Sequence, residues 1–141
     1  MNIVAIGAHP DDLEIFAYGF LAAASSRGDN LILGVATDGA AGGVNQGAEL
    51  ARQRAEEAKN GLAALGTPTL LDLPDGQLAD APNAQNRIKD FIRNAAPDLV
   101  ITHAPEDYHP DHRALATYVR DAAGFICPVL FCDTLMGVGF T

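Results

Sequence analysis

The amino-acid sequence predicts an α/β fold, in which a mainly parallel five-stranded sheet lies between two layers of helices. Three observations support this prediction. Short apolar runs alternate with helical patterns along the whole chain. The runs are almost continuously apolar, as in strands buried on both faces. Polar residues gather directly after the runs, at the strand ends that carry function in such sheets. We therefore expect a Rossmann-like, three-layer α/β/α architecture, formed by a single domain of 141 residues.

Five strands are expected, in chain order. Their length of four to six residues is usual for buried strands, and glycine, proline or polar residues bound them. The predicted strands are Ile3 to Gly7, Leu31 to Ala36, Thr69 to Leu73, Leu99 to Thr102 and Pro128 to Cys132.

Four helices are expected between the strands, and each is long enough for a crossover connection. Gly28, Gly66 and Pro97 mark the ends of the first three helices. The predicted helices are Leu13 to Arg27, Ala48 to Leu65, Asn83 to Ala95 and Asp111 to Ala123. The segment 38–47 contains four glycines, so we predict a mobile active-site loop there and not a hairpin.

Composition limits the partners of the chain. A net charge of −9 repels polyphosphate, which argues against nucleic acid and leaves small neutral substrates open. The longest uncharged stretch falls short of the roughly 18 apolar residues of a membrane span. The amino terminus has no positively charged signal region. Cys127 and Cys132 do not form a CxxC pair, which favours reduced thiols and a cytoplasmic location.

Two polar clusters follow the first and fourth predicted strands. The first is His9-Pro10-Asp11-Asp12, and the second is His109-Pro110-Asp111-His112. Because His9 and Asp12 are three residues apart where a strand turns into a helix, both side chains can face one point. A divalent ion held there with one later histidine would keep its fourth position for water, which is typical of catalytic zinc.

The second cluster leaves two roles open for its histidines, since only one of them need bind the ion. If His112 is the ligand, His109 lies one turn earlier and can act as an acid or stabilise an oxyanion. Pro110 suits the first position of the following helix. Asp111 can orient the neighbouring imidazole from behind.

Several further residues have ordinary structural explanations beside a functional one. Arg54 and Glu57 have the spacing of a surface ion pair on a helix. Asp75 precedes a glycine in Leu-Pro-Asp-Gly, as turn-forming aspartates do. For His103, Glu106 and Asp107 the default is a solvated loop, although their nearness to His109 allows a supporting or substrate-binding role.

The motifs together resemble the PIG-L/LmbE-like N-deacetylases. Ala-His-Pro-Asp-Asp-Leu-Glu near the amino terminus and His-Pro-Asp-His after the fourth strand are both complete and in order. Thr-Asp-Gly-Ala-Ala-Gly, the Arg54 to Glu57 spacing and Leu-Pro-Asp-Gly also match, so the resemblance covers essentially the whole chain.

The resemblance implies a metal-dependent hydrolase that removes acetyl from an N-acetylglucosaminyl group. The metal is typically zinc, with iron or another divalent ion as the alternative. By motif, the metal ligands are His9, Asp12 and His112. Asp11 resembles the general base, and His109 resembles the residue that assists the tetrahedral intermediate or the leaving amine. Arg54 and Asp75 occupy positions similar to substrate-contacting ones.

One departure from the family concerns length, because members usually extend well beyond 141 residues. We therefore expect this chain to be the amino-terminal core of a longer family fold, and to bind metal while turning over slowly alone. Its partner would be a small N-acetylated sugar conjugate. Homo-oligomerisation is left open.

Three other functions are compatible with parts of the sequence. A metal amidase acting on a thiol conjugate or another non-sugar amide fits the same motifs. A phospho-receiver module has five parallel strands and an acidic pair, but it requires a lysine after the last strand. The only lysines, Lys59 and Lys89, lie in helical segments. A nucleotide-binding module would need a GxGxxG turn where this chain places carboxylates.

Overall fold

The computed structural model describes residues 1–44 and 46–133 and has an α/β fold. Its five strands form one parallel sheet in the order β3-β2-β1-β4-β5, which confirms the predicted fold class. The strands are β1 (Asn2–Gly7), β2 (Asn30–Thr37), β3 (Thr69–Leu73), β4 (Leu99–His103) and β5 (Val129–Cys132). The helices are α1 (Asp12–Phe16), α2 (Tyr18–Ser26), α3 (Ala48–Gly61), α4 (Ala84–Asn94) and α5 (Pro110–Ala123).

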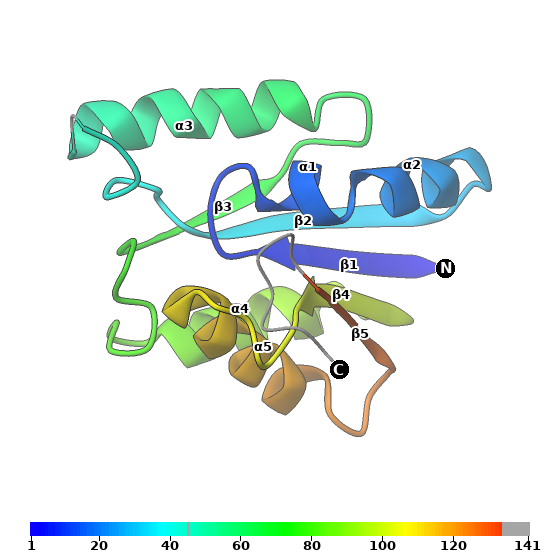
Figure 1. Ribbon diagram of the computed structural model, residues 1–141. Helices are drawn as coiled ribbons and strands as arrows, with labels where there is room; N and C mark the ends of the chain where they lie inside the picture. Colours follow the sequence, from blue (N-terminus) through cyan, green and yellow to red (C-terminus); the bar gives the residue numbers. More distant parts are fainter. Residues whose placement is uncertain (45, 134–141) are drawn as a thin grey trace.

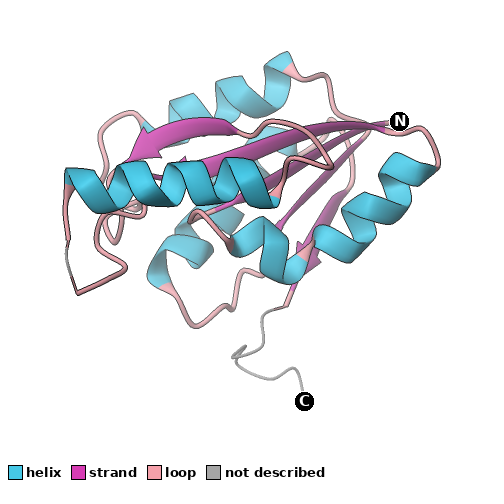
Figure 2. Cartoon of the chain, turned by 90° about the horizontal axis from the view of Figure 1, so that it is seen from above, coloured by secondary structure: helices cyan, strands magenta, loops and turns pink. Residues whose placement is uncertain are grey.

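Helices cover both faces of the sheet (Figure 1). Helices α1, α2 and α3 lie on one face, and α4 and α5 lie on the other. Helices α1, α2 and α3 connect the strands while the chain moves from β1 to β3. Helices α4 and α5 connect the strands while the chain returns to β4 and continues to β5. With the right-handed crossovers usual in parallel sheets, the change of direction places the two sets on opposite faces. The view from above shows the same layering (Figure 2). The strand order therefore reverses between β1 and β4, which is where such sheets bind ligands.

Two apolar cores fill the space between the sheet and the helices. Val4 and Ile6 of β1 pack with α4 and α5 in one core. Ile3 and Ala5 of the same strand pack with α1 and α2 in the other. Each of these four side chains is at most 1% exposed, which confirms that the central strand is buried on both faces.

Two helix boundaries differ from the prediction. The first predicted helix is divided at Ala17, whose φ of −122° departs from helical values. Gly19 lowers the local helix preference, and the division lets α1 and α2 pack into the same core. The second predicted helix ends at Gly61, a poor helix former, and Leu62 to Leu65 continue as a turn.

The start of α5 agrees with the sequence, because Pro110 is its first residue and His109 its N-cap.

In the segment 38–47, residue 45 lies outside the described residues, and the mobility of this loop stays a prediction. Residues 134–141, which include the chain end after the fifth strand, also lie outside them. Among the helices described, none is long and apolar enough to cross a membrane.

Candidate metal centre

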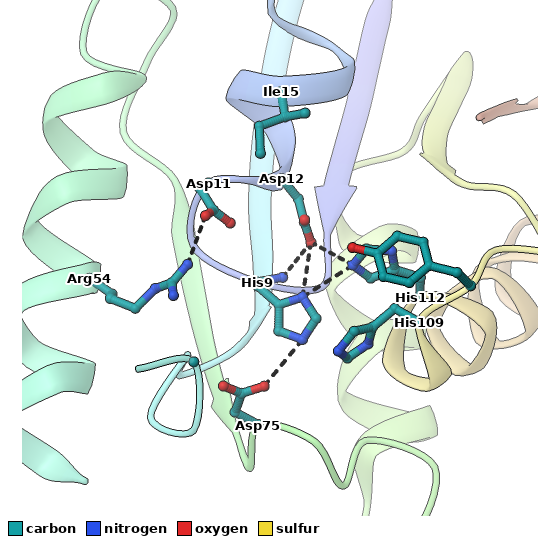
Figure 3. A pocket seen from close by; sticks show the side chains of 10 residues that line it. His9, Asp11, Asp12, Ile15, Arg54, Asp75, His109 and His112 are labelled. Carbon is teal, nitrogen blue, oxygen red and sulfur yellow. Dashed lines mark hydrogen bonds and ion pairs between the residues drawn. The ribbon is translucent and has the colours of Figure 1, made fainter. Parts of the chain in front are cut away.

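The two polar clusters meet at the carboxyl ends of β1 and β4. The segment between β1 and α1 supplies His9 and Asp11, and Asp12 is the first residue of α1. The segment before α5 supplies His109, and His112 lies in the first turn of that helix. All five line an open pocket of about 230 Å³ (Figure 3). The sequence therefore predicted correctly that the clusters converge.

Three side-chain atoms form a nearly equilateral triangle at the base of this pocket. His9 Nδ1 lies 3.2 Å from His112 Nε2. Asp12 Oδ2 lies 3.4 Å from each of these nitrogens. Two ligands about 2.0–2.1 Å from a tetrahedral zinc ion are about 3.3–3.4 Å apart. The triangle therefore has the dimensions of one face of a zinc coordination sphere.

Other groups of side chains in the centre are also close enough to hold a metal ion. Among the described residues they are His9, His109 and His112; Asp12, His103 and His112; and His9, Asp75 and Asp111. A backbone amide engages one donor atom in each of these groups; in the triangle it engages only Asp12 Oδ2, an oxygen with a second lone pair, and neither of the histidine nitrogens. His109 Nδ1 accepts from Asp111 N at 3.1 Å, and Asp111 Oδ2 accepts from Gly76 N at 2.7 Å.

His103 is completely buried and supports the centre from behind. Its Nε2 lies 3.0 Å from Ala8 N and 3.1 Å from Asp12 Oδ2, so this atom is engaged by a backbone donor or by the carboxylate. The ring stacks on His112 with 3.7 Å between centroids. Burial lowers the pKa of His103, because it disfavours the charged form of the ring. The default expectation of a solvated loop residue was therefore wrong.

Carboxylates stand behind both histidines of the triangle. His9 Nε2 lies 3.1 Å from Asp111 Oδ2 and 3.2 Å from Asp75 Oδ1. His112 Nδ1 lies 3.0 Å from Asp107 Oδ1, although this contact is not aligned as a hydrogen bond. Each ring thus turns one nitrogen toward a carboxylate and the other into the triangle. Histidines that bind metals are commonly oriented in this way.

Asp111 supports a different ring from the one that the sequence suggested. We expected its carboxylate to orient a neighbouring imidazole within His109-x-x-His112, whereas it contacts His9. The same carboxylate accepts from Gly76 N and Leu78 N, at 2.7 and 3.0 Å. Because Asp111 lies at the second position of α5, its side chain reaches back to the loop after β3.

The centre has an excess of negative charge. Burial alone would lower the pKa of His9, but hydrogen bonds and charges from Asp111, Asp12 and Asp75 outweigh it and raise this pKa to about 10. Burial would raise the pKa of Asp12, but hydrogen bonds to His103, His112 and His9 hold it well below its usual range. Such surroundings favour a bound cation.

Asp11 and Arg54 form one side of the pocket. Burial raises the pKa of Asp11, and the nearby charge of Arg54 opposes this rise. Arg54 Nη2 lies 2.8 Å from Asp11 Oδ2. The surface pair of Arg54 with Glu57 that the spacing suggested is not the contact found, since Glu57 accepts from Gln53 at 2.8 Å. Arg54 points inward because the pocket offers it a carboxylate that is partly removed from solvent.

His109 faces the same pocket with a defined tautomer. Because its Nδ1 accepts the amide proton of Asp111, the neutral ring carries its own proton on Nε2. Burial, together with the neighbouring His9 and His112, lowers the pKa of His109. A neutral ring of this tautomer is a hydrogen-bond donor and a poor metal ligand.

Asp107 lies in the same loop, and for this residue as for His103 the default expectation of a solvated side chain was wrong. Its side chain is fully buried, and it contacts the His112 ring besides accepting from His109 N at 3.0 Å. A signal was present in the sequence, because a carboxylate stands two residues before the second cluster. Its burial, which distinguishes it from a solvated loop aspartate, needed the structure.

A family model described as PIG-L, GlcNAc-PI de-N-acetylase, matches residues 4–123. The chain belongs to the PIG-L family. A curated relative of this PIG-L chain is the uncharacterized deacetylase YaiS of Escherichia coli strain K12. The two are 33% identical over an alignment of 125 positions, and the match covers 81% of this chain and 63% of the relative.

Solved structures of deacetylases share the fold of this PIG-L chain. An N,N'-diacetylchitobiose deacetylase from Pyrococcus horikoshii superposes with a TM-score of 0.81 at 27% identity, covering 88% of this chain. A deacetylase from the teicoplanin biosynthesis pathway superposes with a TM-score of 0.83 at 21% identity, covering 100% of this chain. The present chain spans 49% of the first of these structures and 72% of the second.

Proposed function

We propose that this PIG-L chain is a zinc-dependent hydrolase that removes the acetyl group from a small N-acetylglucosaminyl substrate. The proposed ligands are His9, Asp12 and His112, with iron as an alternative metal. The observation that carries the proposal is the triangle of three donor atoms, 3.2 to 3.4 Å apart, at the base of a pocket. The two free cysteines are compatible with a cytoplasmic, reducing location.

The donor set fits zinc in type as well as in spacing. Two imidazoles and one carboxylate, with a further position open to the pocket, are typical of catalytic zinc sites. The hydrogen bond that His109 Nδ1 accepts from Asp111 N supports a role for His109 other than that of a ligand, because it leaves the ring proton on Nε2. When bound, the ion would polarise an amide carbonyl and ease the deprotonation of water.

Asp11 is the proposed general base. Its carboxylate lines the pocket and is 54% exposed, so a water molecule and a substrate can reach it. Asp11 would take a proton from the attacking water and later deliver it to the leaving amine. The elevated pKa of this carboxyl favours such transfer in both directions.

His109 is proposed to stabilise the negative charge that develops on the carbonyl oxygen. Its Nε2 carries a proton because Nδ1 is occupied by the Asp111 amide, and the ring lines the pocket. A neutral donor that is already oriented contributes to such stabilisation without reorganisation. Arg54 and Asp75 line the same pocket and are proposed to contact the sugar.

The test is release of free amine by the zinc-loaded chain from methyl N-acetylglucosaminide, an N-acetylated thiol conjugate and a simple acetamide. We expect slow but measurable turnover of the sugar. Replacement of Asp11 by Asn should reduce it by at least about 100-fold, as expected for loss of a general base. Equal turnover of all three substrates would contradict the sugar specificity, and an unaffected Asp11→Asn variant would contradict the assigned base.

A further inference from the structure

Asp11 occupies an unfavourable backbone conformation. It directly precedes α1 and has φ 134° and ψ −19°, which residues with a side chain rarely adopt. An aspartate at this position usually caps the helix with its carboxylate. Within the described part of the chain, Asp11 makes no such cap. His9 N bonds Asp12 Oδ2 at 2.6 Å and Asp12 N bonds His9 O at 3.2 Å, so the turn has local hydrogen bonds, whereas the carboxylate of Asp11 must be held by contacts from elsewhere.

Arg54 supplies these contacts from α3. Its Nη2 donates to Pro10 O at 2.8 Å and to Asp11 Oδ2 at 2.8 Å. One nitrogen thus binds both the backbone and the carboxylate of the unfavourable turn. Figure 3 shows Arg54 reaching toward Asp11 from the side of the pocket opposite His109 and His112. The arginine side chain is only 17% exposed, whereas that of Asp11 is 54% exposed.

The loop after β2 encloses the arginine closely. A Cβ atom at Gly42 would lie 2.6 Å from Arg54 Nη1. At Gly39, whose φ is 67°, a Cβ would lie 2.9 Å from Pro10 Cδ and 3.1 Å from Arg54 Cδ. The two glycines therefore leave space for the arginine to cross to the Pro10–Asp11 turn.

We propose that Arg54 is a positioning residue, which holds the carboxylate of Asp11 in the orientation needed for proton transfer. Arg54 has this effect through its hydrogen bonds to Pro10 and Asp11, in addition to its proposed contact with the sugar. This inference rests on the proposed function, because it takes Asp11 as the base. A positioning residue affects kcat, whereas a residue that only binds substrate affects KM.

A double-mutant cycle separates the two roles. Arg54→Ala should lower kcat by about 100-fold, the order expected for misplacing a reacting group by 1 Å, in addition to any rise in KM that comes from its proposed contact with the sugar. In the Arg54→Ala/Asp11→Asn double variant, the loss of kcat should not exceed the loss in Asp11→Asn alone. If the losses of kcat in the two single variants multiply in the double variant, or if Arg54→Ala changes KM alone, the positioning role would be overturned.

The matched control is Arg52→Ala, since Arg52 lies on the same helix, bonds Glu49 and is exposed. It should leave kcat and KM unchanged. Gly42→Ala provides a second route, because it displaces the guanidinium group without removing its charge. It should lower kcat in the same direction as Arg54→Ala. Added guanidinium ion should restore part of the activity of Arg54→Ala, and absence of both effects would count against the proposal.

A readout that needs no turnover keeps this inference separate from the proposed function. Hydrogen–deuterium exchange at residues 11–13 should be faster in zinc-loaded Arg54→Ala than in the wild type or Arg52→Ala, at an unchanged thermal midpoint. Unchanged exchange would overturn the positioning role alone. Faster exchange with full activity in Asp11→Asn would instead overturn the assigned base, and with it the catalytic consequence of the arginine contact.

Discussion

The position of single protons separates the proposed metal ligands from the proposed hydrogen-bond donor in this centre. His109 receives the Asp111 amide on Nδ1, so its proton lies on Nε2 and points into the pocket. His9 and His112 instead turn one nitrogen toward a carboxylate and leave the other for the triangle. His109 thus offers a hydrogen-bond donor to the pocket, whereas His112, three residues later, offers a nitrogen to the triangle. The difference comes from a backbone amide and a buried aspartate.

Replacing Asp107 by Asn tests this assignment at the residue scale. Asn can still accept from His109 N, but it removes the negative charge beside His112 Nδ1. We expect zinc affinity to fall by about 10- to 100-fold, as is usual when a carboxylate behind a metal-binding histidine is lost. The measurement is competition with a chromophoric chelator. Glu106→Gln, in the same loop but exposed, is the control and should bind zinc normally.

An unchanged zinc affinity in Asp107→Asn would show that the His112 ring is held by its stacking on His103 alone. The thermal midpoint of the variant must be measured in parallel. A variant that loses zinc only because it unfolds would shift that midpoint without zinc as well.

At the scale of elements, the centre depends on how closely β1 approaches the start of α1. A Cβ added to Gly7, the last residue of β1, would lie 2.8 Å from Asp12 Cβ. Glycine at this position lets the first residue of α1 lie directly over the strand end. Asp12 Oδ2 then receives the His9 amide at 2.6 Å. The carboxylate proposed to bind the metal is thereby fixed by the strand-to-helix turn itself.

Gly7→Ala should therefore weaken the metal centre. The added methyl group must displace Asp12, and overpacking of this kind costs about 1–3 kcal/mol. We expect a lower free energy of unfolding and weaker zinc binding, measured by denaturant titration and by chelator competition. Gly19→Ala is the control, since no described atom outside its immediate chain surroundings lies within 4 Å of a Cβ there. If Gly7→Ala and Gly19→Ala had the same free energy of unfolding and the same zinc affinity, the close approach of β1 to α1 would not control the centre.

The sequence predicted the elements well because their signals are local. Alternating apolar runs and helical patterns identified all five strands and the helical segments between them. The division at Ala17 was not predictable, because it depends on packing of α1 and α2 into a shared core. The partners of Arg54 likewise depend on tertiary structure. Its spacing from Glu57 suggested a surface pair, whereas its partners lie more than 40 residues away.

At the scale of the whole molecule, the reversal of strand order brings together segments about 100 residues apart in the sequence. His9 follows β1 and His112 belongs to α5, and β1 and β4 are adjacent strands. The motifs indicated convergence, but which atoms face one another depended on backbone contacts that no motif contains. The triangle connects α1, the end of β1 and the start of α5. A bound ion would therefore join parts of the fold that separate on unfolding.

Zinc should consequently stabilise the whole chain. An ion that binds only the folded state at 100 times its Kd adds about 2.7 kcal/mol. In a domain of this size that corresponds to a rise of roughly 5–10 °C in Tm, measurable by calorimetry. The rise should disappear in a His9→Ala/His112→Ala variant and persist in His109→Ala, because only the first two face the triangle. A lost shift in His109→Ala would instead favour the group of His9, His109 and His112, and would contradict the tautomer assigned from the Asp111 amide.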